Sequence, residues 1–146
     1  MANVLIAFVS MSGNTEEIAD MLRDELKQLG HTVTMEEMDD LMPAEMLRYD
    51  AVLLGSYTWG DGDLPYEIED FYDDLEVMEF DGLKTAVFGS GDREYPIFCG
   101  AVDTLQKRLK ETGANVVTEG LRLEFAPEKE DVETCKAFVT SFSNAL

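Results

Sequence analysis

The chain has 146 residues, of which 45% are hydrophobic, and its 11 basic and 31 acidic side chains give a net charge of −20. This length suits a single domain with a buried core, expected over residues 1–146, and the hydrophobic content argues against disorder. The charge disfavours nucleic acid and anionic membrane surfaces as partners, and no apolar run approaches the ~20 residues of a membrane helix. Since no secretory signal precedes the first apolar run, we expect a cytoplasmic protein.

Short apolar runs alternate along the chain with helical patterns. The expected strands are 4–9, 32–35, 51–55, 85–89 and an interrupted edge strand, 115–118 with 121–123, broken at Gly120. Apolar stripes at helical spacing cover 18–29, 68–75, 102–109 and 132–142, the first helix beginning near Glu16. This alternation predicts an α/β fold in which a doubly wound parallel sheet carries four or five helices on its two faces.

Ligands of such sheets bind beyond the carboxyl ends of the strands, which three loops leave here: residues 10–15, 56–66 and 90–100. The first loop supplies three hydroxyls and one amide just before a helix N-terminus, where unpaired backbone N–H groups attract anions. It contains no Lys or Arg, so it is no Walker A loop, and its single glycine does not make a dinucleotide fingerprint. A terminal phosphate held by neutral donors is one interpretation, and an ordinary turn capped by Asn14 or Thr15 is the other.

The second and third loops combine glycines with aromatic residues. Trp59, the only Trp, lies between turn residues, and Tyr95 lies in the third loop. Aromatic side chains placed on loops beside a phosphate site can form a slot for a flat conjugated ligand. The alternative is that both rings simply cover the end of the sheet.

Together the three loops resemble those of the short-chain flavodoxins, one-domain FMN-binding electron carriers, and the similarity runs the length of the chain. It rests on the first loop with Ala19 and Leu22, on Thr58-Trp59-Gly60-Asp61, and on Gly91-Asp92 through Tyr95 to Phe98-Cys99-Gly100. The resemblance implies the flavodoxin-like five-stranded sheet with strand order 2-1-3-4-5.

The resemblance also implies which residues hold FMN. The phosphate would be held by Ser10, Ser12, Asn14, Thr15 and Thr58 with backbone N–H groups of the first loop. Trp59 and Tyr95 would cover the two faces of the isoalloxazine, backbone N–H groups of Asp92 and Cys99 would meet its pyrimidine edge, and the Gly60–Asp61 peptide would face N5. The full candidate set is Ser10, Met11, Ser12, Gly13, Asn14, Thr15, Tyr57, Thr58, Trp59, Gly60, Asp61, Ser90, Gly91, Asp92, Tyr95, Phe98 and Cys99. Tyr57, Arg93 and Pro96-Ile97 depart from the usual family pattern.

The function implied is that of a one-electron carrier, not an enzyme with its own substrate. Ten carboxylates and no basic residue between Asp61 and Asp81 suit basic-faced redox partners. These would be a flavodoxin or ferredoxin reductase and an acceptor oxygenase, synthase or oxidoreductase, met by a monomer. Two alternatives remain: an FMN-dependent NAD(P)H:quinone reductase of the same fold, and a binding domain that has lost its flavin.

Three further expectations concern residues outside the loops. His31, the only histidine, is expected to be solvated in a turn after the first helix. Cys99 is expected to act through its backbone N–H and not through its thiol. Met35, Met38, Met42 and Met46 have nearly helical spacing and are interpreted as core-filling residues.

Overall fold

The structure is a computed structural model that describes residues 1–146. Its strands and α-helices alternate along the chain, as the apolar runs predict. In chain order they are β1 (Asn3–Val9), α1 (Asn14–Gln28), β2 (Thr32–Glu37), β3 (Ala51–Tyr57), α2 (Glu69–Leu75), β4 (Lys84–Gly91), α3 (Gly100–Glu111), β5 (Asn115–Val116), β6 (Leu121–Glu124) and α4 (Val132–Asn144).

All paired strands of the sheet are parallel, in the order β2-β1-β3-β4-β5, so the expected fold class and strand order are confirmed. The edge strand is interrupted as predicted: β5 pairs with the start of β4 and β6 pairs with its end. Gly120 lies in the interruption, where a Cβ would come within 2.5 Å of the Val102 side chain. The chain therefore passes so close to α3 here that only glycine fits without a shift.

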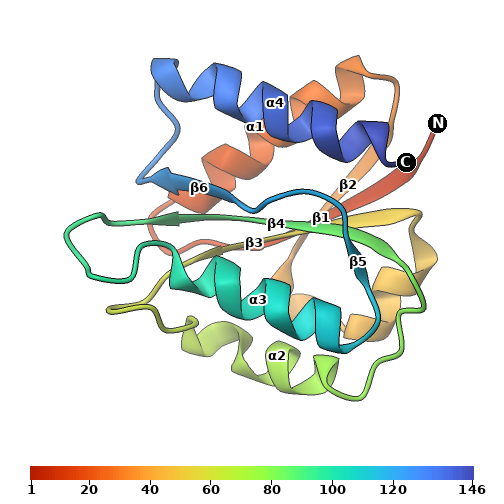
Figure 1. Ribbon diagram of the computed structural model, residues 1–146, viewed down its shortest axis with the longest axis horizontal. Coiled ribbons are helices and arrows are strands. Elements are labelled where there is room, and N and C mark those ends of the chain that lie inside the picture. The colour runs from red at the N-terminus through yellow and green to blue at the C-terminus, as the bar shows by residue number, and fades with distance from the viewer.

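The helices cover both faces of the sheet (Figure 1). Helices α1 and α4 lie together on one face, and α2 and α3 lie on the other. Side chains alternate along β1: Val4, Ile6 and Phe8 pack toward α1 and α4, whereas Leu5 and Ala7 pack toward α2 and α3. The central strands are thus buried on both faces, which explains their continuous apolar sequences.

Two expectations for the connections are wrong in part. The methionine segment forms no α-helix but two 3₁₀ turns, Met38–Asp40 and Pro43–Arg48; Met38 and Met46 are buried in the core, whereas Met42 is exposed. His31 is not free in solvent. Its Nδ1 accepts a hydrogen bond from the Ala2 N–H at 3.2 Å and its Nε2 lies 2.8 Å from the Ser143 hydroxyl, so the ring links β1 to α4.

The carboxyl ends of β1, β3 and β4 lie along one edge of the sheet, at the left in Figure 1. The first, second and third loops all leave from this edge, and β6 ends there too. Candidate residues far apart in sequence are therefore brought to one end of the molecule. None of the helices has the length and apolar character needed to cross a membrane.

Candidate functional site

The first loop presents a group of unpaired backbone donors at the start of α1. Gly13 has φ +92, a left-handed conformation that glycine adopts without strain and that turns the chain into the helix. The backbone N–H groups of Met11, Ser12, Asn14 and Thr15 make no hydrogen bond within the protein. Unpaired donors at the positive end of a helix dipole can bind an anion without a basic side chain.

Hydroxyls around this loop accept hydrogen bonds from the backbone. Ser10 Oγ accepts from the N–H groups of Gly13 at 3.1 Å and Glu16 at 3.4 Å. Thr58 Oγ1, at the end of β3, accepts from the Ala101 N–H at 3.2 Å. Because a hydroxyl that accepts still has its own proton to donate, both side chains remain donors toward an anion.

Thr15 and Ser90 form a buried pair of hydroxyls. Their oxygens are 2.8 Å apart, Thr15 is 0% exposed and Ser90 is 3% exposed. One proton joins the two oxygens, and the structure gives neither hydroxyl another protein partner. Ser90 lines the small cavity described next and Thr15 does not, so a proton of the pair is available to a ligand acceptor when Thr15 donates to Ser90.

A cavity of about 130 Å³ joins the three loops. Eight of its nine lining residues belong to the candidate set, and the ninth is Phe125, which the sequence interpretation missed. The lining consists of Met11, Ser12, Asn14, Tyr57, Thr58, Ser90, Gly91, Asp92 and Phe125. This volume is below the 300–1,000 Å³ usual for whole small-molecule pockets. The cavity can therefore hold a phosphate group and the linear part of a ligand attached to it, but not a three-ring system.

The second loop is a tight turn closed by its own backbone. Trp59 N–H donates to the Asp63 carbonyl at 2.8 Å and Asp63 N–H donates to the Trp59 carbonyl at 2.9 Å. Between them Gly60 has φ +53, and a Cβ there would meet no atom within 4 Å. Trp59 is 54% exposed and faces a separate hollow of about 540 Å³ shared with Tyr66 and Tyr72. Trp59 therefore does not line the 130 Å³ cavity.

The third loop packs directly on the second. A Cβ on Gly100 would lie 2.7 Å from Gly62 Cα, and the Ile97 N–H donates weakly to the Asp61 carboxylate at 3.4 Å. Tyr95 is 46% exposed and, like Trp59, does not line the small cavity. The two loops therefore pack against each other, and each presents an exposed aromatic ring.

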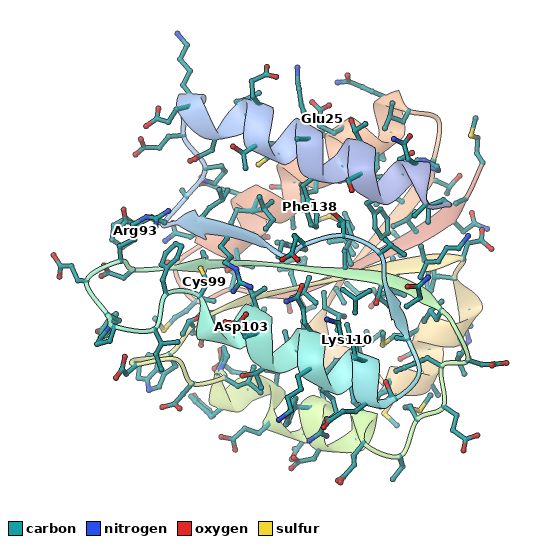
Figure 2. All side chains as sticks on the ribbon, viewed as in Figure 1. Glu25, Arg93, Cys99, Asp103, Lys110 and Phe138 are labelled. Carbon is teal, nitrogen blue, oxygen red and sulfur yellow. The ribbon has the colours of Figure 1, made fainter.

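Arg93 brings a positive charge to the third loop, and its guanidinium contacts one aromatic and one acidic side chain. Its guanidinium lies 4.2 Å from the centroid of the half-buried Phe98 ring and 4.0 Å from the Glu124 carboxylate. The Arg93 N–H also donates to Glu124 at 3.0 Å. Figure 2 shows Arg93 in the third loop, near the end of β6. The positive charge at this position is thus partly compensated.

Cys99 ends the third loop at the start of α3 (Figure 2) and is left-handed, with φ 54. Burial raises the pKa of its thiol to about 11, so the thiolate needed for nucleophilic chemistry is scarce near neutral pH. The backbone N–H groups of Cys99 and Asp92 have no partner within the protein. Both observations support the prediction that Cys99 contributes its backbone and not its sulfur.

The Tyr57 side chain is hydrogen-bonded to Glu67, the residue that follows the second loop. Its hydroxyl donates to the Glu67 carboxylate, with both oxygens at 2.8 Å. Burial first and Glu67 second raise the pKa of the Tyr57 phenol well above its usual value of 10.0. This contact positions the end of β3, where Thr58 and Trp59 follow.

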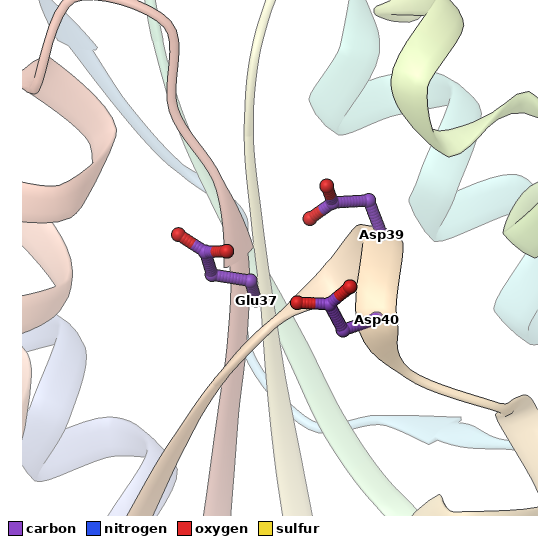
Figure 3. A group of neighbouring side chains, drawn as sticks. All are labelled: Glu37, Asp39 and Asp40. Atoms are coloured by element: carbon purple, nitrogen blue, oxygen red, sulfur yellow. The ribbon is translucent and has the colours of Figure 1, made fainter.

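Negative charge is concentrated at this edge beyond the loops themselves. One carboxylate oxygen from each of Glu37, Asp39 and Asp40 lies within 4.8 Å of the others, just past β2 (Figure 3). All three side chains are exposed. They extend the acidic surface around the site toward the β2 edge of the sheet.

Comparisons with known proteins agree with this geometry. The family model described as Flavodoxin matches residues 6–138. A protein described as probable flavodoxin 1 of Bacillus subtilis is 50% identical over 143 residues, which cover 97% of this chain and 90% of that protein. Oxidised flavodoxin 2 from Bacillus cereus is 51% identical with a TM-score of 0.96, covering 99% of this chain and 100% of that one. Oxidised flavodoxin 1 from the same organism is 43% identical with a TM-score of 0.94, covering 99% of each chain.

The doubly wound sheet and the neutral anion site beneath exposed aromatic loops define a flavin-binding electron-transfer protein. The chain belongs to the flavodoxin family, whose members bind FMN and carry electrons between redox proteins. The resemblance inferred from the three loops is therefore confirmed. The quinone reductase alternative is not favoured by these relatives.

Proposed function

We propose that the 130 Å³ cavity holds the FMN phosphate and that the flavin ring lies outside it, against the exposed aromatic loops. The observation that carries this proposal is the donor set: four unpaired backbone N–H groups with hydroxyls of Ser10, Thr58 and the Thr15–Ser90 pair that retain protons to donate. Ser12 makes no hydrogen bond within the protein, and with Asn14 it completes the donors that line the cavity. Hydrogen bonds to a charged group are worth roughly 1.5–3 kcal/mol each, so several offset the missing cation.

The ring system has the two loops as its supports. Trp59 and Tyr95 are each about half exposed in the protein, which leaves apolar area for a flat ligand to cover. The unpaired N–H groups of Asp92 and Cys99 are available to the pyrimidine edge, and the Gly60–Asp61 peptide to N5. When bound, FMN supplies the redox chemistry, accepting and releasing electrons.

The protein's own residues bind and orient in this proposal and do not turn over a substrate. Both thiols are buried, and burial raises the pKa of Cys99 and of Cys135 to about 11. His31 is occupied in a structural link at the opposite edge of the sheet. The chain thus offers no activated nucleophile beside the cavity, as suits a carrier.

The proposed partners are redox proteins with a basic face. They comprise a flavodoxin or ferredoxin reductase as donor and an oxygenase, synthase or oxidoreductase as acceptor. Exposed carboxylates on the second loop and on α2 support this choice, because they complement such a face and steer its approach. We further propose that residues 1–146 form one domain that acts as a monomer. Two buried, unpaired cysteines support a reducing compartment such as the cytoplasm.

Substitution of Ser12 tests the phosphate assignment most cleanly, because this side chain has no structural bond to lose. Ser12→Ala is expected to weaken FMN binding by about 10-fold and to leave riboflavin binding and the unfolding free energy unchanged. Titration of the apoprotein followed by Trp59 fluorescence measures both ligands. Equal losses for FMN and riboflavin would place the phosphate elsewhere.

A further inference from the structure

Phe125 combines two unfavourable features at the edge of the cofactor cavity. It follows β6 directly, and its ring is 53% exposed. Its φ of 56 lies in the left-handed region, where a side chain with a Cβ crowds the backbone. Asn, Asp and Gly adopt this conformation readily, but for a bulky aromatic residue it is a genuine outlier.

A hydrogen bond to the end of β4 holds the Phe125 backbone in this conformation. The Phe125 N–H donates to the Gly91 carbonyl at 3.0 Å, which extends the β4–β6 pairing one residue beyond Glu124. Gly91 is also where β4 ends and the third loop begins. The position of the Phe125 ring is therefore coupled to the cofactor loop and not to a flexible tail.

The Phe125 ring lines two hollows. On one side is the 130 Å³ cavity with Ser12, Asn14 and the third-loop backbone; on the other is a polar hollow of about 320 Å³ with Arg93, Glu128 and Asp131. The ring thus separates the proposed phosphate cavity from a charged, solvent-filled surface. The backbone strain of Phe125 and the exposure of its apolar ring beside the cavity are both explained if a bound ligand covers the ring.

We infer that Phe125 is an additional cofactor-contacting residue, which closes the cavity over the ribityl segment of the bound flavin and shields it from water. This inference rests on the proposed placement of FMN in the cavity. In FMN the ribityl segment joins the phosphate to the ring system. With the phosphate held at Ser12 and Asn14 and the ring at the exposed aromatic loops, the ribityl segment lies between them. Riboflavin shares that segment, so Phe125 should contribute to the binding of both ligands.

The test uses substitutions that separate strain from contact. Phe125→Gly relieves the left-handed backbone and removes the ring, so the apoprotein should melt at an equal or higher temperature while FMN and riboflavin both bind about 10-fold more weakly. Phe125→Leu retains an apolar cover and should keep both affinities within about three-fold. Asp81→Gly is the matched control: Asp81 has φ 50 and lies away from the cavity, so this substitution should relieve strain without changing flavin affinity.

Three outcomes would overturn the inference. Unchanged affinity in Phe125→Gly, with a normal loss in Ser12→Ala, would show that FMN occupies the cavity without touching the ring. A loss confined to FMN would assign Phe125 to the phosphate instead of the ribityl segment. A large drop in apoprotein stability in Phe125→Gly would make the ring a structural element. Failure of the cavity assignment itself is distinguishable, because Ser12→Ala would then leave FMN affinity unchanged.

Discussion

Thr15 at the start of α1 and Ser90 near the end of β4 share a buried hydrogen bond of 2.8 Å across 75 residues of sequence. The bond links the proposed phosphate loop to the strand that leads into the third loop. It also orients a hydroxyl that has no other protein partner. In the proposed site, the same pair therefore serves both the binding of the phosphate and the packing of this end of the sheet.

Breaking this pair should affect stability and FMN binding together. Ser90→Ala leaves the buried Thr15 hydroxyl without a partner and is expected to cost about 1–3 kcal/mol of unfolding free energy, measured by urea denaturation of the apoprotein. Thr15→Ala should weaken FMN by roughly 1–3 kcal/mol and leave riboflavin nearly unaffected. In the double variant the stability losses should be less than additive, since no buried hydroxyl is left alone. Additive losses would show that the two hydroxyls act independently.

Substitution of Gly60 tests the second loop. Gly60 already has φ +53 in this structure and a Cβ there meets no neighbour, so Gly60→Ala should cost only the backbone strain of about 1–2 kcal/mol. The family resemblance implies that the Gly60–Asp61 peptide flips when the flavin is reduced. If it does, Gly60→Ala should also lower the first reduction potential. Gly62→Ala serves as the comparison for stability. Its new Cβ would add a contact of 3.0 Å with the Ile97 side chain to the backbone strain, so it should destabilise the protein more than Gly60→Ala does. A potentiometric titration in which Gly60→Ala and wild type have equal first potentials would contradict the peptide switch.

Exposed carboxylates near the second loop should steer basic partners. Glu67 is a poor choice for substitution because it binds the Tyr57 hydroxyl, whereas Asp63 and Glu69 are exposed and make no ion pair. We expect Asp63→Asn with Glu69→Gln to slow reduction by a basic reductase at low salt and to have little effect at high salt. The double variant Glu76→Gln with Glu79→Gln removes the same charge from the segment that follows α2. Equal slowing by both pairs in stopped-flow measurements would show that only net charge matters.

The buried thiols predict a loss of stability in alkali. Burial raises the pKa of Cys99 and of Cys135 from 9.0 to about 11, so the folded state favours the neutral thiols. Their contribution is fully present below pH 9, where unfolded thiols are also neutral, and declines as pH rises toward 11. Urea denaturation at pH 8 and pH 10.5 measures this decline, which should be smaller in Cys135→Ala than in wild type. Rapid alkylation of native protein at pH 8 would contradict the burial of the thiols.

The strands could be predicted from sequence because each central one is buried on both faces and carries a continuous apolar run. Gly120 marked the edge-strand interruption in the sequence, but the physical reason is visible only in the structure, where a Cβ on Gly120 would come within 2.5 Å of the Val102 side chain. The first loop could be proposed as a phosphate site from sequence because hydroxyls, an amide and one glycine directly follow a strand.

Tertiary contacts explain what sequence reasoning missed. His31 was expected in solvent, but its two partners, Ala2 and Ser143, are brought to it only by the folded sheet. Phe125 was missed because its left-handed φ depends on the hydrogen bond to Gly91 and is unusual for an aromatic residue. The four methionines were interpreted as core-filling residues from their spacing, but Met42 comes just before the 3₁₀ turn that begins at Pro43, and its side chain is exposed.

The most direct test of the central claim is a titration of the apoprotein with FMN and with riboflavin, followed by the fluorescence of Trp59, the only tryptophan. We expect one FMN bound per chain, strong quenching of Trp59 by the neighbouring flavin, and a preference for FMN over riboflavin of at least about 100-fold, because several neutral donors converge on the phosphate. Equal affinity for the two flavins, or no uptake of FMN at all, would contradict it.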